Sequence, residues 1–195
     1  MADEREHLAE VEEAEELDRE TAARRAAAMS FIRRLGDPVL RSRALPVETF
    51  DDALRSQVAH MGRIMEDALG VGLAAPQLGM SQRLLVYRVG PDAPLVALVN
   101  PEIEWRGEET EVDVEGCLSI PGVHVEVERS VHIRVRAQDE YGDERLVEAS
   151  GHEARIIQHE IDHLDGVLIL DRCPKEQRKE AMRALREAER AQAAA

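Results

Sequence analysis

The 195-residue chain contains only two cysteines, Cys117 and Cys173. A secreted disulfide framework usually shows more cysteines in a shorter chain, so that class of protein is not favoured. We therefore expect free thiols in a reducing cytoplasm, available for metal binding or catalysis. The acidic N-terminus lacks the apolar core of a signal peptide, and no apolar run approaches the length of a membrane span.

Basic residues are also scarce, with 25 Lys and Arg against 40 Asp and Glu and a net charge of −15. Phosphate contacts need clustered basic side chains, so dedicated nucleic-acid binding is disfavoured. Much of the acid lies between Asp3 and Glu20. We predict an acidic N-terminal extension over residues 1–28, helical or disordered, one folded domain over residues 29–173, and a locally basic C-terminal helix or tail over residues 174–195.

Hydrophobic periodicity predicts three helices within this frame. Apolar residues spaced by three and four follow Thr49, which we expect to be an N-cap, and Gly70 suits the left-handed position after the helix. A second helix is expected to begin at Ser150, with a capping box, and to stop at Gly166. The third is expected to begin near Pro174.

Short β-rich segments separate these helices, and two of them alternate apolar and polar residues with period two. The dipeptide between those two, Arg129-Ser130, fits either a bend in one ribbon or a hairpin turn. The mixture of helices and short strands predicts an α+β fold. The expected strands cover residues 83–89, 95–100, 123–128, 131–136, 146–148 and 167–170.

The strongest chemical signal is the sequence His159-Glu160-Ile161-Asp162-His163, an H-E-x-x-H motif. Residues four apart lie about 40° apart around a helix, so both imidazoles can bind one ion while Glu160 faces its open position. The surrounding helix is apolar on much of its circumference, which makes a surface helix with incidental histidines a poor explanation. The motif therefore predicts a hydrolytic metal site.

A catalytic ion usually has three protein ligands, so one ligand remains to be found. Alternation along their strands places two candidates, His124 and His132, on exposed faces. Cys117 is flanked by small residues that let the backbone approach an ion and a substrate. A glycine- and alanine-rich loop over residues 70–79 could admit a ligand, although alone it is a weak signal. The candidates for the third ligand are Cys117, Cys173, His124, His132, His152 and several carboxylates.

Three segments, taken in order, resemble the signature segments of bacterial peptide deformylase. Residues 70–77 match its G-x-G-x-A-A-x-Q segment, residues 115–119 its E-G-C-L-S segment, and residues 158–166 its Q-H-E-x-D-H-L-x-G segment. The resemblance covers about residues 31–173. It implies a peptide-deformylase-like fold, with small antiparallel or mixed sheets around a central metal-binding helix and with N- and C-terminal helices.

The resemblance also implies a role for each site residue. The metal ligands are Cys117, His159 and His163, Glu160 is the general acid and base, and Glu115 is paired with Arg129. The implied oxyanion donors are the Gln77 side-chain amide and the Leu118 backbone N–H. The residues implied to line the substrate cleft are Val71, Gly72, Gly116 and Ile156.

The implied reaction removes the formyl group from the N-terminal formylmethionine of newly made proteins and releases formate. The resemblance favours Fe²⁺, with Zn²⁺, Ni²⁺ or Co²⁺ as possible substitutes, and it suggests that the C-terminal helix contacts the ribosome. His152 departs from the pattern, since a bulky apolar residue is expected there. Two alternatives are an H-E-x-x-H metallopeptidase with a carboxylate or histidine as third ligand, and a non-catalytic relative that keeps the fold for binding.

Overall fold

The computed structural model describes residues 2–193, with the side chains of residues 17–188 and 190–191. A five-stranded antiparallel sheet has the order β1-β2-β3-β6-β7, and β4 pairs with β5 in a separate two-stranded sheet. The strands are β1 (Gly72–Ala74), β2 (Leu84–Tyr87), β3 (Val96–Arg106), β4 (Thr110–Cys117), β5 (Ile120–Ser130), β6 (His132–Gln138) and β7 (Glu144–Ser150).

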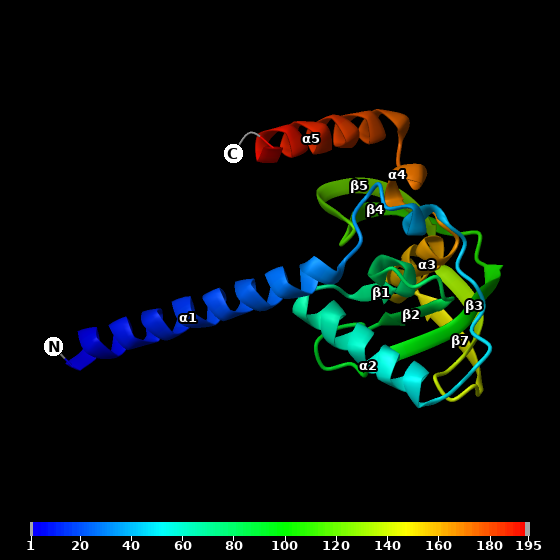
Figure 1. Cartoon of the computed structure of the whole chain (residues 1–195), viewed down its shortest axis with the longest axis horizontal. Coiled ribbons are helices and arrows are strands. Elements are labelled where there is room, and N and C mark those ends of the chain that lie inside the picture. The colour runs from blue at the N-terminus through cyan, green and yellow to red at the C-terminus, as the bar shows by residue number, and fades with distance from the viewer. Residues whose placement is uncertain (1, 194–195) are drawn as a thin grey trace.

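One helix, α3, lies among the strands, α2 lies along one side of the body, and the two terminal helices project away from it (Figure 1). Helix α3 contacts strands of both sheets, whereas α2 contacts β1 and β2 of the larger sheet. The two terminal helices, α1 and α5, extend on the same side of the molecule (Figure 1). None of the helices among residues 2–193 is long and apolar enough to cross a membrane. The helices are α1 (Ala2–Phe31), α2 (Asp52–Asp67), α3 (Gly151–Leu164), α4 (Ile169–Arg172) and α5 (Lys175–Ala193), with short 3₁₀ turns at η1 (Pro38–Arg41) and η2 (Ala75–Leu78).

Strand β2 separates two apolar cores because its successive side chains point to opposite faces. Leu84 and Val86 pack with α2 and the end of α1. Leu85 and Tyr87 pack with residues of α3 and β6. Because β2 is buried on both faces, all of its residues are apolar or aromatic. The face that carries Leu85 and Tyr87 holds α3 against the larger sheet. A third core joins β5 to α4 and α5.

Two features at the ends of α2 differ from the sequence-based expectation. The N-cap is Asp51, whose carboxylate accepts a hydrogen bond from the Leu54 N–H at 3.0 Å, so the prediction of Thr49 is wrong. At the other end Leu69, with φ of 60°, takes the left-handed conformation in place of Gly70. A glycine near a helix end is a frequent terminator, but tertiary packing decides which residue turns.

Helix α3 follows Ser150, as predicted, although the expected capping box is wrong because that side chain makes no cap hydrogen bond. Gly166 has a φ of 74° and lies just after the end of α3, which confirms the prediction that the helix ends at this glycine. Residues 167–170 are not a strand, since they lead into α4. The Arg129-Ser130 dipeptide is not a hairpin turn, because it carries the chain from the smaller sheet to the larger one.

Candidate metal centre

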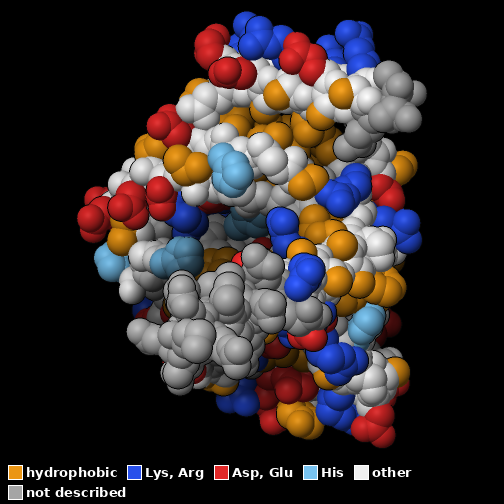
Figure 2. Space-filling model, turned by 90° about the vertical axis from the view of Figure 1, so that its left-hand side faces the viewer, with side chains coloured by type: hydrophobic (Ala, Val, Ile, Leu, Met, Phe, Trp, Pro, Cys, Tyr) orange, Lys and Arg blue, Asp and Glu red, His pale blue; other side chains and the backbone are white. Residues whose placement is uncertain are grey.

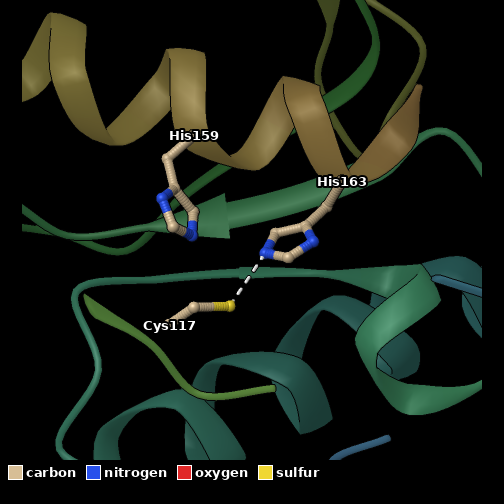
Figure 3. A group of neighbouring side chains, drawn as sticks. All are labelled: Cys117, His159 and His163. Atoms are coloured by element: carbon tan, nitrogen blue, oxygen red, sulfur yellow. Dashed lines mark hydrogen bonds between the residues drawn. The ribbon is translucent and has the colours of Figure 1, made fainter. Parts of the chain in front are cut away.

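Helix α3 presents two imidazoles on one face, and the end of β4 presents a thiol opposite them (Figure 3). The rings of His159 and His163 lie 5.0 Å apart between centroids. The Sγ atom of Cys117 lies 3.3 Å from Nε2 of His163. One ligand atom from each residue lies within 4.8 Å of the others. The three side chains implied to bind metal are therefore brought together from segments more than 40 residues apart.

The local fold of the β4–β5 hairpin carries Cys117 to this place. The register shifts between Gly116 and Cys117, so Cys117 stands opposite Ile120 at the tight end of the hairpin. A Cβ on Gly116 would lie 3.3 Å from the His124 ring, tighter than most contacts. The small residue keeps the hairpin narrow at the point where the thiol turns towards α3.

The charge state of Cys117 is set by two opposing effects. Burial disfavours a thiolate, but the neighbouring His163 and His159 imidazoles lower the pKa of the thiol well below its usual value. The thiolate is the form that binds metal ions. The pocket thus favours the ligand state of the sulfur.

His159 is oriented from behind by a buried carboxylate. Its Nδ1 lies 3.0 Å from Oε2 of Glu115, which leaves Nε2 to face Cys117 and His163. Glu115 in turn accepts two hydrogen bonds from Arg129, each 3.0 Å long, as the resemblance implied. Burial alone would raise the pKa of Glu115, but hydrogen bonds from His159 and Arg129 lower it to about 2. Such a partner fixes the tautomer and direction of a ligating histidine.

Two further residues belong to this network, and the sequence analysis assigned a role to neither of them. Arg155 donates to Glu115 at 2.9 Å and to the Val127 carbonyl at 2.9 Å. Asp162 accepts from Arg129 at 2.6 Å, and it lies within the H-E-x-x-H motif itself. One signal in the sequence could have indicated the network: Arg155 is a lone cation on the apolar side of α3, and a buried charge requires partners.

Glu160 lies beside the three ligand residues in a closely packed niche. Its side chain is 4% exposed, and its Oε2 atom has no hydrogen-bond partner in the described part of the chain. Burial is the main cause that raises its pKa above the ordinary value. A Cβ on Gly72 would lie 2.4 Å from its Oε1 atom, so only glycine leaves room for the carboxylate. A free carboxylate with a raised pKa suits proton transfer near neutral pH.

Gln77 holds its carboxamide in a fixed orientation next to the thiol. Its Oε1 atom accepts a hydrogen bond from the Ala74 N–H at 2.9 Å. Its Nε2 atom donates to Ser119 at 3.2 Å and lies 3.9 Å from Sγ of Cys117. The amide donor therefore points towards the cluster.

A cavity of about 380 Å³ opens beside the cluster. Figure 2 shows a hollow with histidine side chains around it. The unexpected His152 is exposed and lines the cavity instead of filling it. Of the residues expected at the site, the lining includes Val71, Gly72, Gln77, Gly116, Cys117, Leu118, Ile156, His159 and Glu160.

The remaining candidates for a third ligand do not join the cluster. His124 and His132 are exposed, as the alternation predicted. Cys173 is half-buried near the start of α5, and burial raises the pKa of its thiol. That direction is the opposite of what a reactive or ligating cysteine needs.

A model of the polypeptide deformylase family matches residues 29–179. The chain belongs to the peptide deformylase family. The chain is 49% identical over 158 residues to a peptide deformylase of Acidothermus cellulolyticus, with 81% of this chain and 86% of that protein covered. The chain is also similar to peptide deformylases whose structures are solved. That of Thermotoga maritima is 51% identical with a TM-score of 0.71, covering 73% of this chain and 96% of that one.

A second solved deformylase, from Synechococcus elongatus in complex with actinonin, is 43% identical with a TM-score of 0.76. It covers 78% of this chain and 85% of that one. The α+β deformylase fold implied by the motifs is thus confirmed. The chain is a metal-dependent amidohydrolase that removes the N-formyl group from nascent peptides. The metallopeptidase alternative is wrong, since the family and the thiol at the site both oppose it.

Proposed function

We propose that Cys117, His159 and His163 hold a ferrous ion and that Glu160 is the acid and base of deformylation. The observation that carries this assignment is the position of the three ligand atoms, within 4.8 Å of one another and close to Glu160, whose Oε2 atom has no hydrogen-bond partner among the described residues. A thiolate with two imidazoles suits Fe²⁺ and also Zn²⁺, Ni²⁺ or Co²⁺. When bound, the ion supplies Lewis acidity, which polarises the formyl carbonyl and acidifies water.

Glu160 would move the proton in both halves of the reaction. Its free oxygen accepts a proton from the water that attacks the formyl carbon and returns it to the leaving amine. Gly72 supports this role because the absent side chain leaves the carboxylate in place next to the cavity. The products are formate and a free N-terminal methionine.

The formyl oxygen gains negative charge during attack, and two hydrogen-bond donors would stabilise that charge. The Gln77 amide is held by Ala74 and aimed towards the cluster. The Leu118 backbone N–H follows the thiol directly in the chain. One such donor contributes about 3–4 kcal/mol to the transition state in well-studied hydrolases. The methionine side chain would lie among Val71, Gly72, Gly116 and Ile156.

The assignment is tested by anaerobic formate release from formyl-Met-Ala-Ser, with the acetyl peptide as substrate control and metal analysis of the same sample. We expect formate from the ferrous-loaded protein with the formyl peptide only. The Cys117→Ser variant should lose metal and activity, whereas Cys173→Ser should keep both. Full metal content and activity in Cys117→Ser would contradict the ligand assignment.

The C-terminal helix supports a second element of the proposal, a transient contact with the ribosome in the cytoplasm. Ala181, Met182 and Leu185 pack against the core that contains β5, which fixes one side of α5. Basic side chains remain exposed on the helix, and such clusters suit phosphate contacts. They are Lys175, Arg178, Lys179, Arg183, Arg186 and Arg190.

A further inference from the structure

The end of helix α1 forms part of the wall of the substrate cavity. Arg25 and Met29 line the cavity together with the segment that contains Gly72. Arg25 precedes the residues matched by the family model, which begin at residue 29. The N-terminal extension therefore adds a side chain to the cavity that the matched part of the chain does not supply.

This part of α1 is anchored to the folded domain. Ala28, one turn after Arg25, and Ile32 are both buried in the core that α2 covers. Directly after the helix, the Arg33 N–H donates to the Gln77 carbonyl at 2.7 Å. The helix thus holds Arg25 at a defined place relative to the site.

Of the two arginines that line the cavity, Arg25 is the exposed one. It is exposed, and no hydrogen bond or ion pair engages its guanidinium within the described residues. Arg155, by contrast, is buried and bound to Glu115. Asp113 on β4 is exposed and accepts a hydrogen bond from the next residue along its strand. Lys and Arg side chains also border the hollow in Figure 2.

We infer that Arg25 is a specificity residue that binds the substrate beyond its formylmethionine and favours aspartate or glutamate at the second or third position. The inference rests on the proposed function, in which formylmethionine occupies the inner cavity beside Glu160. The rest of the peptide must then leave past the rim, where Arg25 is exposed. A free guanidinium pairs with a carboxylate in a fork geometry that lysine lacks.

The test compares kcat/KM for formyl-Met-Xaa-Ala and formyl-Met-Ala-Xaa peptides in which Xaa is Asp, Gln or Lys. The ferrous-loaded full chain should prefer Asp to Lys by about two- to fivefold in at least one series, the range expected for an exposed ion pair. The preference should appear in KM, because Arg25 binds ground state and transition state alike. It should shrink as salt is raised.

A matched pair of variants separates a local contact from overall charge. Arg25→Glu should abolish or invert the preference, whereas Arg24→Glu changes the net charge equally and should keep it, since Arg24 does not line the cavity. The inference would be overturned if the ratio of kcat/KM for the Asp peptide to that for the Lys peptide were equal in the two variants, or if the unmodified chain showed no preference. The proposed function would remain intact in either case. Absence of formate with every peptide would overturn both.

Discussion

Single residues at this site acquire their chemistry from what surrounds them. Glu160 follows His159 directly in the sequence. Yet its Oε2 atom has no hydrogen-bond partner in the part of the chain that the structure describes, whereas the His159 imidazole is held by Glu115. The H-E-x-x-H spacing was enough to predict the pair of imidazoles, since a helix fixes their separation. It could not indicate Arg155, because the partners that make its burial favourable come from distant strands.

Removing the Glu160 carboxylate should affect chemistry and leave metal binding unchanged. Glu160→Ala is expected to lower kcat by about 10²- to 10⁴-fold, the usual contribution of a positioned acid and base. Metal content should stay at the level of the unmodified protein, because Glu160 is not among the three ligand residues. Rapid-quench kinetics and metal analysis on one sample check this prediction. Full activity in the variant would contradict the mechanism.

The low pKa of Glu115 predicts how stability depends on pH. Its pKa falls from 4.5 to about 2 in the folded chain, so folding stabilises the ionised carboxylate relative to the protonated one. This contribution, on the order of 3 kcal/mol, is fully present above about pH 4.5 and is lost as pH falls towards about 2.

The measurement is urea unfolding of the metal-free protein between pH 2 and pH 6. Glu115→Gln should be less stable than the unmodified protein at pH 6, and the difference should narrow as pH falls. A constant difference across this range would show that the ionised carboxylate does not carry the effect.

At the scale of elements, the sequence predicted those whose own residues determine them. Helix α3 and the strands β5 and β6 show their periodicity directly, and each was expected close to its observed place. Strand β1 has three residues, too few for a period to show, and it exists because β2 pairs with it. Residues 167–170 were expected to form a strand because they are apolar, but they lead into α4, and Leu168, Ile169 and Leu170 pack in the core that joins β5 to α5.

Gly166 offers a test of how strictly α3 must end. Its φ is 74°, and a Cβ there would lie 2.8 Å from the Arg41 backbone carbonyl. Gly151 also has a positive φ, of 56°, but a Cβ there would meet nothing within 4 Å. We expect Gly166→Ala to lower the free energy of unfolding by about 1–3 kcal/mol more than Gly151→Ala does, because only at Gly166 does a clash add to the strain of a positive φ. Equal losses in denaturant unfolding would contradict this reading.

At the scale of the whole molecule, the ligand residues join two sheets and a helix that are separate in the chain. Cys117 ends the smaller sheet, whereas α3 packs on the larger one. An ion held between them should stabilise the fold, because it binds the native arrangement and not the unfolded chain.

Removal of the ion by a chelator should therefore lower the melting temperature, by roughly 5–10 °C if the ion is present at about a hundred times its dissociation constant. Differential scanning calorimetry before and after chelation measures the shift. Cys117→Ser supplies the control, since without the thiolate its melting temperature should respond little to the chelator. An equal shift in both proteins would show that the chelator acts elsewhere.

The cavity has a consequence for the time at which the reaction occurs. Its volume of about 380 Å³ admits one extended end of a polypeptide, and its reactive carboxylate is only 4% exposed. An N-terminus that is already part of a folded domain cannot reach that depth. Where the first residues of a chain end up inside a core of their own, deformylation must therefore precede that burial.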